Sequence, residues 1–268
     1  MDKLTKEDKE KINIKLVCDS DLAYDSPDHI SPRGTMQDNS TNPRFNRKVY
    51  RLLDKVKRQI RVLDMGCSGG GFIRECNNDG CLAIGLEGSD YSEKHRRAEW
   101  AIIPEFLFTC DIGKNFKLFK DNEHIKFNLI TSWEYLEHIN PEDVDTLIKN
   151  IKNNLLDDGI FIASLSNFPD ICNGIDLHQS KHPKKWWYNK FKEHGLYERK
   201  ELYGYFNNQY VRGGKSNKGN FHIIFSKNDI KFDNIKLNYK EKFKDMWIGN
   251  YIQRCLEFLV TGKVLTGK

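Results

Sequence analysis

The sequence predicts an α/β fold: a doubly wound, mostly parallel sheet with helices on both faces and an antiparallel addition near the C-terminus. Short apolar stretches alternate with helical patterns from residue 61 to residue 166, which is typical of a parallel sheet. Beyond residue 166 this alternation ends, and aromatic stretches suited to an antiparallel pair follow. At 268 residues, the chain is long enough for one such domain with additions.

The elements follow one another in a regular order along the chain. Strands are predicted where apolar residues run together between turn signals, at residues 61–65, 81–87, 105–110, 127–133 and 159–166. Helices are predicted before and between these strands, at residues 47–56, 72–78, 92–102 and 141–155. The sequence after residue 166 predicts a helix at 183–197, strands at 202–206, 221–225 and 235–239, and a terminal helix at 246–260.

Residues 1–45 differ from the domain that follows, which we assign to residues 46–268 with C-terminal additions over about 200–268. They are rich in Pro, Asp, Asn and Ser, and therefore predict turns rather than regular structure. Composition alone also permits a disordered arm. Ile30, Met36 and Phe45 are spaced like anchors of a segment that packs on the domain.

Charge and cysteine usage limit the class of protein. The net charge of +5 and the pI of about 8.7 permit an anionic substrate but do not single out nucleic acid. The charged start predicts no secretory signal, and no apolar run approaches the roughly 20 residues of a membrane span. Seven cysteines without a C-x-x-C pair favour reduced thiols. We therefore expect a cytoplasmic protein with no membrane segment.

The stretch VLDMGCSGGGF, residues 62–72, joins the first strand of the sheet to a glycine-rich turn. Its GCSGG part also fits G-x-S-x-G, the turn that presents a nucleophilic serine in many hydrolases. Asp64 favours a cofactor cradle instead, because an amine-bearing cation needs a carboxylate there and a hydrolase turn does not. Gly69, Gly70 and Gly71 also remove each Cβ that would clash with a bound ligand.

Acidic residues stand at the ends of the first three predicted strands. Asp64 ends the first strand, Glu87 ends the second, and Asp111 follows the third. A carboxylate at Glu87 can accept both ribose hydroxyls of an adenosine, and Asp111 can accept from an adenine amino group beside the apolar Ile112. A nicotinamide-binding fold would favour G-x-G-x-x-G after the first strand, and this loop reads G-C-S-G-G-G.

These motifs resemble those of the class I S-adenosylmethionine-dependent methyltransferases, which have a Rossmann-like fold. The similarity covers residues 62–167 and comprises VLDMGCSGGGF, GLEGSD, TCDI, ITSWEYLEHI and LLDDGIFIASLSN. It implies binding of S-adenosylmethionine and of its product S-adenosylhomocysteine. The cofactor-binding residues that the resemblance implies are Asp64, Gly66, Cys67 and Ser68 for the methionine half, Glu87 and Gly88 for the ribose, Asp111 and Ile112 for the adenine, and Ser132 beneath the sulfonium.

A second group of residues points to proton transfer or to a metal. Glu134, Glu137 and His138 fall at i, i+3 and i+4, so a helical turn would project them to one side. Small-RNA 3′-terminal 2′-O-methyltransferases and ubiquinone-pathway O-methyltransferases have a similar E-x-x-E-H that binds a metal, completed in the former by a later histidine such as His178 or His182. The divalent-metal set is then Glu134, Glu137, His138 and His178. Without a metal, which is our working prediction, His138 or His178 is the general base.

The segment DLHQSKHPKKWWYNKF, residues 176–191, resembles part of methyltransferases that act on sugars and small metabolites. The resemblance implies that His182 and one of Trp186 and Trp187 contact the acceptor, while the other tryptophan packs on the sheet. It also implies that the segment before residue 46 closes over the cofactor as a lid.

We therefore predict O-methylation of a small metabolite or of a sugar or glycan precursor, such as a phosphorylated metabolite. The alternatives are an RNA 2′-O-methyltransferase with a Glu-x-x-Glu-His metal site and a catalytically silent cofactor-binding protein. Against the RNA alternative, basic residues are mixed with acidic ones along the chain, and no RNA-binding module is recognisable. The sequence does not indicate an oligomeric state.

Overall fold

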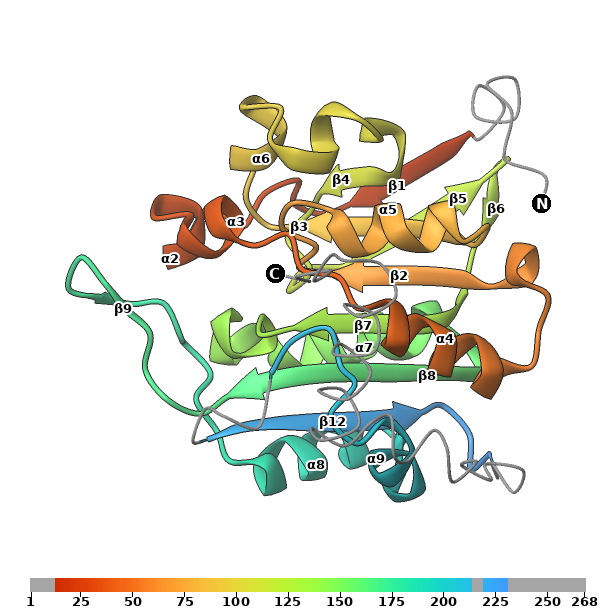
Figure 1. The fold of residues 1–268 in the computed structure, drawn as a ribbon. Helices are drawn as coiled ribbons and strands as arrows, with labels where there is room; N and C mark the ends of the chain where they lie inside the picture. Colours follow the sequence, from red (N-terminus) through yellow and green to blue (C-terminus); the bar gives the residue numbers. More distant parts are fainter. Residues whose placement is uncertain (1–12, 214–218, 231–268) are drawn as a thin grey trace, which may run out of the picture.

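A seven-stranded sheet forms the centre of the protein (Figure 1). The computed structural model describes residues 13–213 and 219–230. In sheet order, the strands are β11 (Tyr197–Glu198), β12 (Asn220–Ser226), β8 (Leu155–Ser166), β7 (Phe127–Trp133), β2 (Arg61–Met65), β3 (Leu82–Glu87) and β4 (Leu107–Thr109). Strands β8, β7, β2, β3 and β4 are parallel, and β12 pairs antiparallel with β8 and β11. The predicted fold class is confirmed.

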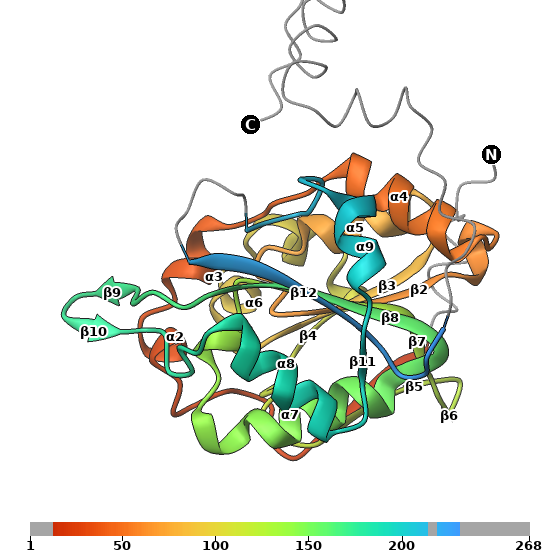
Figure 2. The same cartoon turned by 90° about the horizontal axis from the view of Figure 1, so that it is seen from below.

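Helices cover both faces of this sheet (Figure 2). One face carries α4 (Pro43–Leu53), α5 (Gly71–Asn78) and α9 (Lys200–Phe206), and the other carries α7 (Val144–Asn154) and α8 (Lys184–Glu193). The two faces bury separate apolar clusters, because each helix turns one apolar side towards the strands. The sheet is therefore covered on both sides, and its strand ends are left for function.

Smaller sheets and short helices surround this core. A second sheet contains β1 (Ile14–Cys18), β5 (Phe116–Lys120) and β6 (Glu123–His124), and β9 (Ile171–Cys172) and β10 (Ile175–Asp176) form a hairpin. The short α-helices are α2 (Pro27–Ile30), α3 (Arg33–Gln37) and α6 (Tyr91–Lys94). The 3-10 helices are η1 (Lys57–Gln59), η2 (Ala98–Ala101), η3 (Pro104–Phe106), η4 (Leu136–His138) and η5 (Pro141–Asp143).

Two predicted elements differ from the structure. Residues 202–206 form part of helix α9 and not a strand, because Leu202, Tyr205 and Phe206 are buried at helical spacing. The helix predicted at 92–102 is divided into α6 and η2. Arg96, between the two, and Ala98, the first residue of η2, have a left-handed backbone conformation. The strand predicted at 235–239 and the helix predicted at 246–260 lie outside the described residues.

Residues 19–42, here called the strap, connect β1 to α4 and lie over the carboxyl ends of the parallel strands. Helices α2 and α3 belong to the strap and lie on the side to which the arrowheads of β2, β7 and β8 point (Figure 1). The amide of Ala23 donates to the carbonyl of Gly88 (3.0 Å), and the amide of Gly69 donates to the carbonyl of Asp38 (3.2 Å). The strap therefore touches the loops that follow β2 and β3.

The anchors of this segment are only partly those expected. Phe45 is fully buried, as expected, but 69% of Ile30 and 42% of Met36 are exposed. Leu22 and Thr35 are the buried strap residues instead. The disordered-arm alternative is wrong for residues 13–45, because they are held by backbone hydrogen bonds and by burial.

Candidate functional site

The glycine-rich loop after β2 forms the floor of the candidate site. Gly66 has a φ of +84°, a left-handed conformation that favours glycine, and its amide donates to the carbonyl of Leu86 (2.8 Å). The amide of Ser68 donates to Oε2 of Glu87 (2.7 Å), and its hydroxyl donates to the carbonyl of Asp38 (2.9 Å). The serine hydroxyl thus holds the strap, whereas a nucleophile would face a histidine.

Asp64 lies beneath this loop as a buried carboxylate near the end of β2. Only 2% of it is exposed, and its Oδ1 accepts from the hydroxyl of Thr131 (2.6 Å). Burial raises the pKa of Asp64 to about 8, although the hydrogen bond from Thr131 works in the opposite direction. A cationic ligand would stabilise the ionised form of this side chain.

The raised pKa predicts a pH dependence of stability. The pKa of an unfolded aspartate is about 3.9, so the stabilisation by neutral Asp64 is complete below about pH 4 and is lost as the pH rises towards 8. We expect the free energy of unfolding to fall less steeply over this range in Asp64→Asn, whose amide oxygen still accepts from Thr131. Denaturant unfolding at several pH values measures the free energy of unfolding of both proteins. If it depends on pH in the same way in both, the raised pKa of Asp64 is contradicted.

Glu87 ends β3 and is also buried, with 3% exposed. Its Oε1 accepts from the hydroxyl of Thr35 (3.1 Å), while Oε2 accepts from the Ser68 amide. Burial raises the pKa of Glu87, and the hydrogen bonds from Ser68 and Thr35 lower it. The Thr35 hydroxyl thus donates to this carboxylate as a ribose hydroxyl would, so the chemistry of the carboxylate suits such a donor.

Tyr135 fills the space between the glycine loop and Glu87. A Cβ added at Gly66 would lie 2.4 Å from the Tyr135 ring, and one at Gly88 would lie 2.5 Å from its hydroxyl oxygen. The cavity that remains has a volume of about 50 Å³. Its lining includes Gly66, Glu87 and His138. Small-molecule pockets usually have volumes of roughly 300–1,000 Å³, so Tyr135 or the strap has to move before a nucleotide-sized ligand enters.

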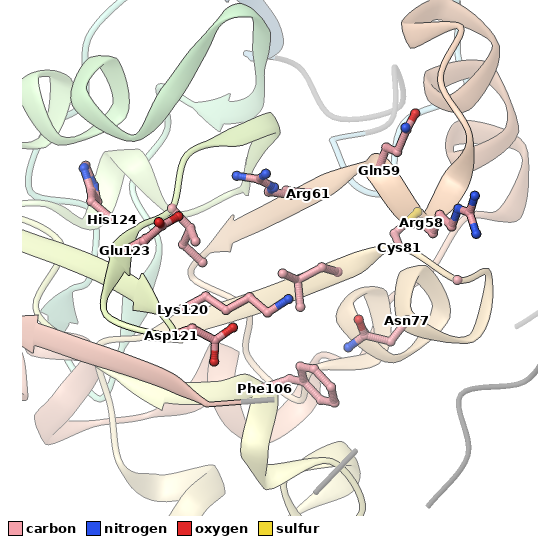
Figure 3. A pocket seen from close by; sticks show the side chains of 13 residues that line it. Arg58, Gln59, Arg61, Asn77, Cys81, Phe106, Lys120, Asp121, Glu123 and His124 are labelled. Carbon is pink, nitrogen blue, oxygen red and sulfur yellow. The ribbon is translucent and has the colours of Figure 1, made fainter. Parts of the chain in front are cut away.

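A larger cavity, of about 680 Å³, lies at the opposite edge of the sheet. It is bordered by the starts of β2 and β3 and by the β5–β6 hairpin, and side chains of both charges, such as Arg61, Lys120 and Glu123, surround it (Figure 3). Ligands of parallel α/β sheets bind beyond the carboxyl ends of the strands. We therefore place the functional site at the smaller cavity.

Glu137, His138 and His178 converge beside the smaller cavity. One potential ligand atom from each lies within 4.8 Å of the others. The two imidazole centroids are 4.5 Å apart, with the rings nearly perpendicular. The amide of Ser180 donates to the carbonyl of Glu137 (2.8 Å), which holds the segment of His178 against η4. The structure thus brings together three of the four residues predicted for a metal.

Polar contacts hold both histidines of this cluster at one ring nitrogen. Oδ2 of Asp28 in the strap contacts Nδ1 of His138, a contact that becomes an ion pair when the ring is protonated, and Nδ1 of His178 contacts the carbonyl of Phe168 (2.5 Å). These contacts leave the Nε2 atoms for other partners. Glu137 is fully buried, and its Oε2 has no hydrogen-bond partner among the described residues. Histidines held at one nitrogen beside an unsatisfied carboxylate oxygen fit a divalent cation.

The charges of the cluster shift its pKa values. Burial raises the pKa of Glu137 to about 8, although the neighbouring His138 works against it. Burial lowers the pKa of His138, but the carboxylate of Asp28 more than offsets this, so the pKa is raised. Burial and the charge of His138 lower the pKa of His178. The two histidines therefore differ in basicity, and His138 is the stronger base.

Glu134 departs from the predicted arrangement. It has a φ of +53° and precedes η4, so no helical turn joins it to Glu137. Its Oε2 accepts from the amide nitrogen of Asn220 on β12 (2.9 Å), while Oε1 of Glu137 accepts from the amide of Ser166 on β8 (2.8 Å). The expected helical turn from Glu134 to Glu137 is absent, because the left-handed backbone turns the chain at Glu134. Glu134 nevertheless lines the smaller cavity together with His138.

Several predicted cofactor residues lie outside the lining of this cavity. Ser132 is fully buried and donates to the carbonyl of Met65 (2.7 Å), so it joins β7 to β2. Ile112 is buried in the core beneath the second sheet, and Oδ1 of Asp111 accepts from the amide of Gly113 (2.9 Å). Cys67 is buried, and a Cβ added at Gly85 would lie 2.6 Å from its sulfur. None of these residues lines the smaller cavity. Cys67 instead lines a cavity of about 20 Å³ together with Asp64, Gly66 and Ser68.

The predicted acceptor residues divide into a core residue and a half-exposed pair. Trp187 is fully buried in the apolar cluster under α8, so it is the tryptophan that packs on the sheet and cannot contact an acceptor. Trp186 is half-buried and stacks on His182, with ring centroids 3.7 Å apart. Neither Trp186 nor His182 lines the smaller cavity.

Sequence reasoning missed seven residues that line the smaller cavity: Asp28, Gly34, Thr35, Asp38, Trp133, Tyr135 and Arg212. Trp133 and Tyr135 lie within the ITSWEYLEHI motif and had a local signal. Asp28 and Thr35 reach the cavity only because the strap crosses the strand ends. Arg212 forms an ion pair with Asp38 of the strap, a contact between residues far apart in the sequence.

Comparisons with known proteins bear on this site. A family model described as "Methyltransferase domain" matches residues 39–209. The ubiquinone biosynthesis O-methyltransferase of Pelagibacter ubique (strain HTCC1062) is 29% identical over 121 residues, which cover 43% of this chain and 46% of that protein. The chain thus matches about half the length of this relative.

Solved structures of methyltransferases are similar in arrangement. A TehB-like SAM-dependent methyltransferase from Corynebacterium glutamicum is 16% identical, with 68% of this chain and 88% of that chain covered and a TM-score of 0.45. The 1,6-didemethyltoxoflavin-N1-methyltransferase from Burkholderia thailandensis is 14% identical, with 75% and 84% covered and a TM-score of 0.48. Within residues 13–213 and 219–230, no helix has the length and apolar character to cross a membrane.

Proposed function

The chain belongs to the methyltransferase domain family and is an S-adenosylmethionine-dependent methyltransferase, and from this premise we propose that it methylates an oxygen atom of a small metabolite or of a sugar or glycan precursor. One observation carries the proposal. His138 lines the same cavity as Gly66, Ser68 and Glu87, so a base stands beside the residues proposed to hold the cofactor. O-methylation requires such a base, because the acceptor hydroxyl has to lose its proton.

Each residue of the cradle has a distinct task in this proposal. S-adenosylmethionine, when bound, supplies an electrophilic methyl group on a sulfonium. Asp64 balances the charge of its amine, Gly66 admits its backbone closely, and Glu87 accepts from the ribose hydroxyls now mimicked by Thr35. The strap acts as the lid, and its closure excludes water from the transfer.

The proton of the acceptor passes to His138. The bound S-adenosylmethionine would supply the methyl group and keep the electron pair of the broken carbon–sulfur bond, and Nε2 of His138 would take the proton of the acceptor hydroxyl. Asp28 holds Nδ1 of the same ring, which leaves Nε2 as the proton acceptor. The acceptor itself would enter past His182 and Trp186, whose stacked rings offer the aromatic face that sugars favour.

Loss of the Glu87 carboxylate is expected to weaken cofactor binding. Glu87→Gln should lower the affinity for S-adenosylhomocysteine by about 1.5–3 kcal/mol, roughly 10- to 150-fold, because a hydrogen bond to a charged group is lost. Titration calorimetry measures this change. Glu93→Gln, on the exposed side of α6, is the matched control and should bind normally. If Glu87→Gln binds S-adenosylhomocysteine as tightly as the wild type does, the proposed role of Glu87 in holding the ribose is contradicted.

A metal-dependent O-methyltransferase is the second candidate. It is favoured by the Nδ1 contacts of His138 and His178 and by the unsatisfied Oε2 of Glu137. These three residues would hold a divalent cation, which would lower the pKa of the acceptor hydroxyl. Oε2 of Glu134 accepts from the side-chain amide of Asn220, and Glu134 does not belong to the group whose ligand atoms lie within 4.8 Å of one another.

A methyl-transfer screen tests the proposed function. The purified protein is incubated with methyl-labelled S-adenosylmethionine and sugar nucleotides, phosphorylated metabolites, other small hydroxyl compounds and short RNAs. We expect label on an oxygen of a small molecule. Label on the 2′-oxygen of RNA alone would favour the RNA alternative, and binding of the cofactor without transfer to any class would favour a silent cofactor-binding protein.

A further inference from the structure

The contact between Asp28 and His138 joins the strap to the proposed base. Asp28 lies on α2, and Oδ2 of its carboxylate contacts Nδ1 of His138, the residue that ends η4. Both side chains are shielded, with 19% of Asp28 and 13% of His138 exposed. In such surroundings, an electrostatic contact is weakened little by solvent, so it favours one orientation of the ring.

The other charged groups near this imidazole have different partners. Oε1 of Glu137 accepts from the amide of Ser166. Asp170 forms an ion pair with Arg33 (3.0 Å), and Glu134 accepts from Asn220. Among the described residues, Asp28 is thus the carboxylate within ion-pair distance of His138, while an oxygen of Glu137 lies within 4.8 Å of one of its ring nitrogens.

The same strap also reaches the proposed ribose site. Thr35, seven residues after Asp28, donates to Oε1 of Glu87 (3.1 Å), and Arg97 holds the carbonyls of Met36 and Asp38 (both 2.9 Å). One segment therefore contacts both the proposed cofactor residues and the proposed base. Movement of the strap would separate Asp28 from His138 at the same time as it uncovers Glu87.

We infer that Asp28 is a positioning residue for His138: the closed strap places its carboxylate on Nδ1–H and thereby fixes Nε2 as the atom that receives the acceptor's proton. The inference rests on the proposed function, because it assigns His138 as the base of that reaction. It makes proton transfer dependent on strap closure, since an imidazole released from Asp28 can rotate and can exchange its tautomers.

The test uses the full chain and two readouts. The first is the tautomer of His138, taken from its ring ¹⁵N chemical shifts and assigned by the loss of the signal in His138→Ala. We expect a proton on Nδ1 in the neutral ring of the wild type and a mixture of tautomers in Asp28→Asn. The second is methyl transfer, for which Asp28→Asn should lower kcat by roughly 10- to 100-fold, as loss of an outer partner of a functional histidine usually does.

Control variants separate positioning from a structural role. Asp25→Asn removes an exposed aspartate of the same strap and should change neither readout. Asp28→Glu should restore the Nδ1–H tautomer and part of kcat, and the affinity of Asp28→Asn for S-adenosylhomocysteine should stay within about twofold of the wild type. A wild-type His138 protonated on Nε2, or an Asp28→Asn protein with the wild-type tautomer, would overturn the inference. Because the tautomer is read without any acceptor, failure of the proposed function leaves this test intact.

Discussion

Replacement of His138 with alanine is expected to lower kcat by roughly 10²–10⁴, the usual contribution of a general base. The imidazole lines the cavity with Gly66 and Glu87, and Asp28 raises its pKa, so it lies beside the proposed cofactor residues and its basicity is increased. Steady-state kinetics with the acceptor found in the screen measure this loss. Calorimetry should show an unchanged affinity for S-adenosylhomocysteine.

Two further measurements decide between the base and the metal. If His138 acts alone, His178→Ala should have a much smaller effect, because His178 lies outside the cavity lining and its pKa is lowered. A chelator should then change nothing. If a metal is held, the chelator should abolish turnover. His178→Ala and Glu137→Gln should then each lower kcat about as much as His138→Ala does. Full activity in His138→Ala would exclude both mechanisms.

The two neighbouring tryptophans are expected to respond very differently to truncation. Trp187 is fully buried against Phe191 and the strands, so Trp187→Ala should lower the free energy of unfolding by about 3–5 kcal/mol. Trp186 is half-buried and loses mainly its stacking on His182, so Trp186→Ala should lower it by about 0.5–1.5 kcal/mol. Urea unfolding of both variants measures these values.

Kinetics complete this comparison. If Trp186 contacts the acceptor, Trp186→Ala should raise KM for the acceptor, and Trp187→Ala should show no specific change in KM under conditions where it remains folded. Equal losses of stability in the two variants would contradict the assignment of Trp187 to the core. An unchanged KM in Trp186→Ala would remove this tryptophan from the acceptor site.

The parallel sheet could be predicted from the sequence because its signals are local. The strand at residues 61–65 has the predicted bounds, and Glu87 ends β3 as expected. The glycine turn after β2 was also predicted, since three consecutive glycines and a preceding aspartate are a local pattern. The strand predicted at residues 202–206 was wrong. Their aromatic character favoured a strand, although a helical spacing was present in the same five residues.

The contacts that complete the site could not be predicted in the same way. Asp28 and His138 are joined by the path of the strap across the strand ends, and no spacing along the chain encodes that path. The turn at Glu134 depends on a left-handed backbone in a residue that is not glycine, which the motif did not indicate. The glycines were expected to make room for a ligand, but a Cβ at Gly69 or Gly71 would meet strap atoms at 2.6 Å.

The strap is fixed at both of its ends, and this limits how it can open. Before it, β1 pairs with β5; after it, Phe45 of α4 is buried in the core. A segment tied in this way opens as a loop, typically on a microsecond-to-millisecond timescale, and does not swing free. Since the closed cavity of about 50 Å³ admits no nucleotide, movement of the strap or of Tyr135 would have to precede binding. In the proposed mechanism, an opening strap would break the hydrogen bonds of Asp38 and Asn39 to the glycine loop.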